Sequence, residues 1–223
     1  MKITWLGQAG LLFEKNDFKI MIDPYFSDSV GRKDPRKRRR APIEDAFLSV
    51  RPDVLIFTHN HLDHYDPETA EKILATGSIL VLAPGSVWDT ARKNGGDHNY
   101  VLFNRHTTWT EQGIRFAAVK AEHSDPTPIG VIIDDGEQKY YITGDTLYNE
   151  EIFGDVPEDI DVVFLPINGA GNNMNKEDAA RFAKRIDAKK VVPIHFGMFD
   201  ELTAGDFPCE NKVIPEIYKE ILL

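Results

Sequence analysis

Residues 58–64 read THNHLDH, and they follow an apolar run, VLIF, at residues 54–57. Side chains on extended backbone alternate between two faces, so His59 and His61 share a face and can bind one metal ion. The aspartate and the third histidine then require a turn, which directs them to a second position. A single histidine more often packs in a core or faces solvent, but three with an aspartate favour metal binding. The stretch predicts a metal site at the end of a buried strand. Zinc is the favoured metal, with manganese or iron as alternatives.

The segments around this histidine cluster predict strands that alternate with helices. Before it, short strands are expected at residues 2–7, 11–14 and 18–23. This antiparallel meander ends at Asp23, because the following proline has no N–H for a sheet. After the cluster, the sequence predicts a helix at 66–75, a strand at 79–83 and a helix at 86–94. Alternation of this kind favours parallel pairing, and the fully apolar strand 54–57 suits a sheet covered on both faces.

The second half repeats this order of elements without a repeat of sequence. Strands are expected at 100–103, 107–110, 114–120, 129–133 and 139–143, followed by a helix at 148–153, a strand at 162–165, a helix at 175–186 and a strand at 191–194. The chain thus runs meander, βαβ, meander, βαβ, which fits two packed sheets flanked by helices. Candidate metal ligands then fall at strand ends on one edge: His59, His61, Asp63, His64, His123, Asp145 and His195.

Length and composition narrow the class of protein. A chain of 223 residues can bury a substantial core, and we expect one domain spanning residues 1–223. The single Cys209 excludes an internal disulfide framework, and the first residues lack a signal-like pattern. No apolar run approaches the roughly 18 residues that span a bilayer. These features predict a cytoplasmic protein without a membrane partner.

Charge is distributed unevenly along the chain. The formal net charge is −10, but residues 32–40 hold seven Lys and Arg against one Asp, a local +6, so the remainder carries −16. An acidic body argues against a nucleic-acid partner. The basic run lies within an irregular segment, about 25–43. It is expected to contact a small anionic substrate, another subunit or the protein's own acidic surface, or else to be a solvated loop.

Motifs along nearly the whole chain resemble the metallo-β-lactamase superfamily. HNHLDH at 59–64 matches the signature H-x-H-x-D-H in full. Further matches are TWLGQAG at 4–10, IDP at 22–24, EHS at 122–124, TGDT at 143–146 and VPIHF at 192–196. The opening motif, TGDT and RAPI at 40–43 look most like the ascorbate-6-phosphate lactonase branch.

This resemblance implies an α+β fold, a four-layer αββα sandwich of two mixed β-sheets flanked by helices. It also implies two divalent metal ions. One would be bound by His59, His61 and His123, the other by Asp63, His64 and His195, with Asp145 bridging them. Asp23 would not bind a metal itself, but its carboxylate would fix the tautomer and orientation of a ligand. His98 and His106 match no metal motif and are expected at the surface or in strand packing.

The resemblance further implies a metal-dependent hydrolase in which a hydroxide activated by two metals attacks a small anionic ester or lactone, such as a phosphorylated sugar-acid lactone. Asp63 is expected to orient the hydroxide or accept a proton. Arg36, Arg38, Arg39 and Arg40 are expected to bind the substrate anion.

Two alternatives stay open at this point. One is a phosphodiesterase or nuclease of the same superfamily, which the acidic body disfavours. The other is a metal-stabilised binding protein without catalysis, which the complete ligand set disfavours. The sequence also leaves open whether the chain forms a homo-oligomer.

Overall fold

The first half of the chain forms one six-stranded sheet in the computed structural model, which describes residues 1–223. The strands β1 (Lys2–Gly7), β2 (Gly10–Lys15) and β3 (Phe18–Ile22) make the predicted antiparallel meander. The strands β4 (Val54–Ile56), β5 (Leu80–Ala83) and β6 (Asn99–Leu102) then add in parallel to β3. Parallel pairing brings the carboxyl ends of β3, β4 and β5 to one edge of the sheet.

The second half forms a second six-stranded sheet. Its antiparallel strands are β7 (Thr108–Glu111), β8 (Ile114–Lys120), β9 (Ile129–Asp134) and β10 (Lys139–Ile142). The strands β11 (Val162–Pro166) and β12 (Lys190–Ile194) add in parallel to β10. Both sheets are therefore mixed, as predicted.

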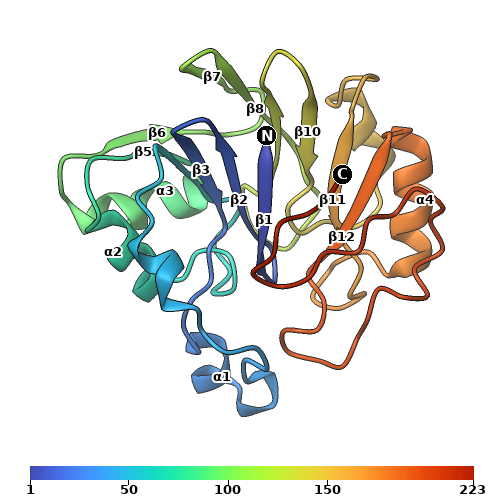
Figure 1. The fold of residues 1–223 in the computed structure, drawn as a ribbon, viewed down its shortest axis with the longest axis horizontal. Coiled ribbons are helices and arrows are strands. Elements are labelled where there is room, and N and C mark those ends of the chain that lie inside the picture. Colours follow the sequence, from blue (N-terminus) through green and yellow to red (C-terminus); the bar gives the residue numbers. More distant parts are fainter.

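Alternation along the strands builds four layers. One set of alternate side chains, including Phe13, Ile56 and Phe164, fills the core between the two sheets. The opposite set packs outward against helices: α2 (Pro67–Leu74) and α3 (Gly85–Ala91) cover the first sheet, and α4 (Lys176–Ile186) covers the second (Figure 1). The four-layer α+β sandwich is confirmed.

Several local predictions differ from the structure. The strand at 100–103 was expected to open the second meander, but β6 pairs in parallel with β5 and belongs to the first sheet. The helix expected at 148–153 is a 3₁₀-helix, η4 (Glu150–Gly154). Two further 3₁₀ turns, η2 (Asp45–Ser49) and η3 (Arg92–Asn94), flank β4 and α3. Their hydrogen bonds are local, so the hydrophobic pattern gives no sign of them.

The segment expected to be irregular, 25–43, contains α1 (Ser29–Lys33) and η1 (Pro35–Lys37). Asp34 begins η1, because its side chain accepts a hydrogen bond from the N–H of Arg36 at 3.1 Å. Asp28 closes the segment by accepting from the N–H of Arg39 at 2.9 Å. Short polar side chains therefore give the basic run a defined backbone.

The last part of the chain runs along the edge strands of both sheets. Residues 212 and 220 form bridges to β12 and β1, and Figure 1 shows this segment beside β1 and β12. No helix of the structure has the length and apolar character needed to cross a membrane.

Candidate metal centre

The seven candidate ligands all lie just beyond the ends of strands. His59 and its neighbours follow β4, His123 follows β8, Asp145 follows β10 and His195 follows β12. Four of them, His61, Asp63, Asp145 and His195, line a cavity of about 1300 Å³ at this edge. The packing of the two sheets therefore brings together side chains that are up to 136 positions apart, from 59 to 195.

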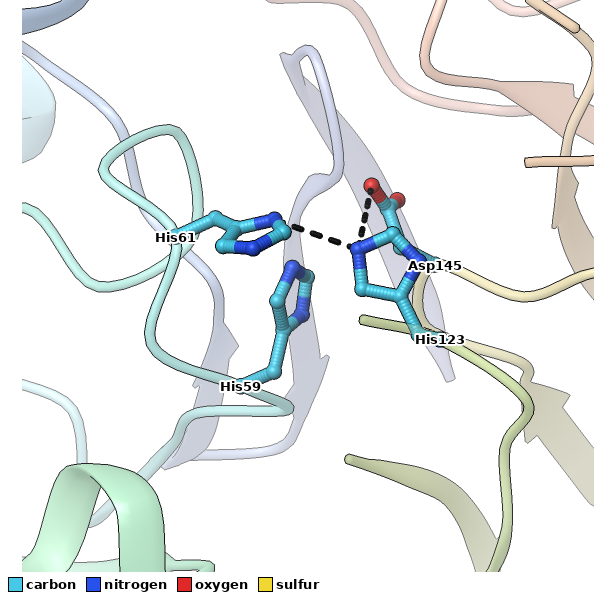
Figure 2. Close-up of side chains that lie close together, drawn as sticks. All are labelled: His59, His61, His123 and Asp145. Atoms are coloured by element: carbon cyan, nitrogen blue, oxygen red, sulfur yellow. Dashed lines mark hydrogen bonds and ion pairs between the residues drawn. The ribbon is translucent and has the colours of Figure 1, made fainter. Parts of the chain in front are cut away.

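One group contains His59, His61, His123 and Asp145, whose nearest nitrogen and oxygen atoms all lie within 4.8 Å of one another (Figure 2). The Nε2 atom of His123 lies 3.1 Å from Nδ1 of His61 and 3.8 Å from Oδ2 of Asp145. On the other side of the ring, Nδ1 of His123 donates to the carbonyl of Asn172 at 3.1 Å. That hydrogen bond fixes the tautomer that leaves Nε2 free to face the group.

A second group contains Asp63, His64 and His195, again within 4.8 Å. Asp145 connects it to the first group, because its Oδ1 lies 3.2 Å from Nε2 of both His64 and His195. The two oxygens of Asp145 thus face different groups, as a bridging carboxylate requires. The ligand roles themselves stay predictions.

Asp23 contacts His64 on the side of the ring that faces away from the other ligands. From the resemblance, Asp23 was expected to fix the orientation of a metal ligand. Its Oδ2 lies 2.8 Å from Nδ1 of His64, so Nδ1–H donates and Nε2 faces the group. Its Oδ1 accepts from the backbone N–H of Thr58 at 2.8 Å, immediately before His59. Asp23 has φ +42, a backbone conformation that residues other than glycine seldom adopt. Strain of this kind is retained mainly at functional sites.

Gly144 permits the close approach of the two sheets at the site. It has φ +62, and a Cβ there would lie 2.7 Å from the carbonyl oxygen of Ile129 and 3.2 Å from Cβ of Thr58. Only glycine fits such a position. The side chain of the next residue, Asp145, is thereby brought beside His59.

The two groups differ in charge. Burial lowers the pKa of His59 well below its ordinary value and also lowers the pKa of His123. Burial acts in the same direction on His64 and His195, but carboxylates, Asp145 foremost, outweigh it. They raise the pKa of His64 well above its ordinary value and the pKa of His195 to about 9.

The aspartates show the complementary effect. Burial alone would raise the pKa of Asp63 and of Asp145, yet the imidazoles of His64 and His195 hold both pKa values below the usual range. Both carboxylates are therefore ionised at neutral pH, the form that binds a cation.

The residues present fit divalent metal ions. Nε2 of His59 is buried without a hydrogen-bond partner, and so is Oδ1 of Asp145, whose two imidazole neighbours are not aligned for hydrogen bonds. Buried polar atoms are normally paired, so atoms left unpaired at a point of convergence indicate a missing partner. Imidazole nitrogen and carboxylate oxygen are suitable donors for zinc, manganese and iron.

Three polar residues of the site were missed by the sequence analysis. Gln8 donates from Nε2 to Oδ2 of Asp63 at 2.8 Å, Asn173 donates to Oδ2 of Asp145 at 2.8 Å, and Asp125 accepts from the N–H of Asn60 at 2.9 Å. Gln8 lies inside the TWLGQAG motif, which offered a signal. The sequence offered no such signal for Asn173 or Asp125, because their partners are 28 and 65 residues away along the chain.

Of the four arginines predicted to bind substrate, only Arg36 lines the cavity, together with Lys33 and Lys37. Arg36 forms a bidentate ion pair with Asp34, at 3.0 and 2.9 Å. Arg38 is exposed and does not line the cavity, so the expected role is not supported by its position.

Arg39 and Arg40 contact the protein instead. The guanidinium of Arg39 donates to the carbonyls of Tyr25 and Ala41, at 2.6 and 2.9 Å, and to the hydroxyl of Tyr218 at 2.5 Å. Arg40 pairs with Glu201 at 3.0 Å. Neither arginine lines the cavity, so a role of these two residues in substrate binding stays a prediction.

His98 and His106 lie away from the metal centre, as expected. His98 packs beside Tyr100, with ring centroids 5.7 Å apart, and His106 is an exposed residue that pairs with Asp155 at 3.2 Å. Neither is a member of the two groups.

Comparison with known proteins identifies the family. Residues 2–195 match the model of the Beta-lactamase superfamily domain. A UPF0173 metal-dependent hydrolase from Ligilactobacillus salivarius is 30% identical, covering 98% of both chains, and one from Exiguobacterium is 31% identical, covering 89% of this chain and 87% of the other. A metallo hydrolase from the archaeon Ignicoccus hospitalis shares the fold, with a TM-score of 0.80, 21% identity and coverage of 99% and 97%. The chain therefore belongs to the UPF0173 metal-dependent hydrolase family of the metallo-β-lactamase superfamily.

Proposed function

We propose that this hydrolase uses two divalent metal ions, with zinc as the preferred candidate, to cleave the ester or lactone bond of a small anionic substrate. The observation that carries the proposal is the convergence of seven ionisable ligand side chains at a cavity whose rim holds lysines. Lys33 and Lys37 line the cavity, and neither forms an ion pair, whereas Arg32 and Arg36 beside them pair with Glu68 and Asp34. A cavity of this kind suits a substrate with a reactive carbonyl at one end and an anion at the other.

When bound, the metal ions supply Lewis acidity, which lowers the pKa of water and polarises a carbonyl. Asp63 lines the cavity with a side chain that is 18% exposed. It is ionised because His64 and His195 hold its pKa down against the effect of burial. Its carboxylate orients an attacking water and accepts the proton that this water loses. Asp145 holds the two groups at a fixed separation through its two oxygens.

The substrate class follows from the rim. The ammonium groups of Lys33 and Lys37 would bind a phosphate or carboxylate as charge-assisted hydrogen-bond donors. A volume of about 1300 Å³ exceeds the range of about 300–1000 Å³ of common ligand sites. The cavity has room for a sugar-acid lactone that carries a phosphate, the substrate type of the lactonase branch that the motifs resemble.

A substrate panel tests the proposal. Protein loaded with Zn²⁺ or Mn²⁺ is assayed with plain lactones, phosphorylated sugar-acid lactones and phosphodiesters. We expect hydrolysis of the phosphorylated lactones, and an Asp63→Asn variant that loses about 10²–10⁴ in kcat, the usual contribution of acid–base catalysis, even at metal concentrations that saturate both groups. A preference for phosphodiesters would replace this function with the phosphodiesterase alternative. Full metal loading without turnover of any class would favour a binding protein.

A further inference from the structure

Gln8 is a buried polar residue held in an unusual backbone conformation. It follows β1, is 2% exposed and has φ +51. Its carbonyl oxygen accepts hydrogen bonds from the backbone N–H of His195 at 2.9 Å and from the indole N–H of Trp5 at 3.0 Å. His195 also has a positive φ, +60. The two residues therefore support each other at the ends of the edge strands of opposite sheets.

The side chain of Gln8 reaches the same group of ligands as its backbone does. Its Nε2 lies 2.8 Å from Oδ2 of Asp63 and 3.0 Å from Nε2 of His195. Only the amide nitrogen can donate to a carboxylate, which assigns the orientation of the amide. The side chain of Gln8 therefore donates to Asp63 and touches His195, and both residues belong to the group of Asp63, His64 and His195.

A different residue supports the other group. Asp125 is 6% exposed, and it accepts from the backbone N–H groups of Asn60 and Thr127 at 2.9 and 2.7 Å. Asn60 lies between His59 and His61, and Asp125 itself follows His123 by two residues. Asp125 thus ties together the two segments that carry the three histidines of the first group. The two groups have separate polar supports.

We propose that Gln8 is a positioning residue that sets the metal affinity of the Asp63, His64 and His195 group alone. This inference rests on the proposed metal-dependent function. Gln8 fixes Asp63 through its side chain, which donates to Oδ2, and His195 through its backbone carbonyl, which accepts from the N–H of His195. Mutation of a residue that hydrogen-bonds to a metal ligand typically lowers metal affinity about 10- to 100-fold. Because Asp125 supports the other group independently, the two groups should lose metal separately.

Zinc binding tests this inference without any substrate. Zn²⁺ is titrated against a chromophoric chelator, and the wild-type chain is expected to bind two ions. Gln8→Met keeps the length of the side chain but removes the donor, and it should weaken one ion about 10- to 100-fold while the other is unchanged. Gln8→Asn provides a second variant, because asparagine tolerates a positive φ well, yet its shorter side chain withdraws the amide. It should show the same selective loss.

Two single-group backgrounds identify which ion is affected. In His59→Ala, the remaining zinc is in the group that Gln8 supports, so adding Gln8→Met should weaken it by the full factor. In His195→Ala, adding Gln8→Met should change the remaining affinity by no more than about twofold, as expected for independent sites. Asp125→Ala is the matched control and should show the reverse pattern.

Equal effects of Gln8→Met in the two backgrounds, or no effect in either, would overturn the role of Gln8 while leaving the proposed function intact. A wild-type protein that binds no zinc would overturn the proposed function and this inference with it.

Discussion

At the scale of single residues, the unpaired nitrogen of His59 and the unpaired Oδ1 of Asp145 are the atoms that indicate a metal most directly. A buried polar atom without a partner costs about 1–3 kcal/mol. Bound cations would satisfy both atoms, because His59 belongs to the first group and Oδ1 of Asp145 faces the second. The family resemblance assigned these two residues, from separate motifs, to one centre, but only the packed structure shows that their free atoms converge.

His59→Ala and Asp145→Ala should therefore lose metal and remain folded. His59 belongs to one group, so its variant should lose one ion, whereas Asp145 faces both groups, so its variant should lose both. The inner core of 25 buried residues does not depend on the site for its packing. Metal content by elemental analysis and folding by circular dichroism provide the measurements. Metal-free protein that is unfolded at room temperature would show a structural role instead.

Metal uptake should release protons. The raised pKa of His64 and of His195, about 9 for the latter, means that both rings are protonated at pH 7 in the metal-free protein. A metal ion must displace these protons, so affinity should rise with pH until about pH 9. Calorimetry in buffers of different ionisation enthalpy counts the protons released. His195→Gln should release about one fewer, and binding without proton release at pH 7 would contradict the prediction.

Residue by residue, the sequence was most informative where ligands cluster and least informative where they are supported. His59, His61 and His64 lie within one motif, whereas Gln8 meets Asp63 across 55 residues. A support of this kind depends on which strand ends become neighbours in space. A single sequence gives no measure of that.

At the scale of elements, the basic run shows how local acids change a prediction. Like charges in one loop repel, which favoured an irregular segment with an anionic partner: the protein's own acidic surface, another subunit or the substrate. In the structure Arg32, Arg36 and Arg40 pair with Glu68, Asp34 and Glu201, so three of the seven positive charges are balanced within the chain. The short helix α1 and the turn η1 can form as a result. Lys33, Lys37 and Arg38 stay free of such partners.

These free charges allow a matched test of substrate binding. Lys33→Ala combined with Lys37→Ala should raise KM for an anionic substrate by about 10-fold, which is about 1.4 kcal/mol, and leave kcat nearly unchanged. Arg38→Ala removes one positive charge from the same loop but outside the cavity, and should leave KM unaltered, whereas each single lysine variant, which also removes one charge, should raise it.

The difference between these variants should shrink in 1 M salt, where the Debye length is about 3 Å. Steady-state kinetics at low and high salt give both readouts. An equal effect of Arg38→Ala would mean that the loop acts through its general field rather than through contact with substrate.

At the scale of the whole molecule, the order of layers could be predicted, because apolar periodicity and the alternation of strands and helices determine which faces are covered. The sheet to which β6 belongs could not be predicted, since the choice between an edge of the first sheet and an edge of the second depends on long-range pairing. The same limit applies to interactions such as that of Asp155, which connects three distant segments. It binds the guanidinium of Arg105 at 2.6 and 2.9 Å and accepts from the N–H of Lys120 at 2.9 Å.

Asp155→Asn should destabilise the fold in a pH-dependent way. Arg105 foremost holds the pKa of this carboxyl below its usual range. A lowered pKa contributes stability above the unfolded value of about 3.9, and that contribution is lost as pH falls through the folded value. Because the side chain is only 9% exposed, the variant should lose about 1–2 kcal/mol at pH 7 in urea unfolding, and the difference should shrink steadily as pH falls below about 4.

Asp159→Asn serves as the control, since Asp159 forms its ion pair with Lys139 at the surface. It should change stability very little at any pH. A loss for Asp155→Asn that is the same at pH 7 and pH 2 would assign the effect to packing rather than to charge.

The position of Tyr218 also implies an order of events during synthesis. Its hydroxyl binds Arg39 and its ring stacks on Phe47, with centroids 5.6 Å apart, so it fastens the base of the basic segment. All seven candidate ligands precede residue 196, whereas Tyr218 is made later. Chains emerge from the ribosome with the N-terminal part first. A nascent chain that has just passed His195 would thus contain every candidate ligand while the basic segment beside the cavity was still unanchored, so the ligand set is complete before this side of the cavity is fixed.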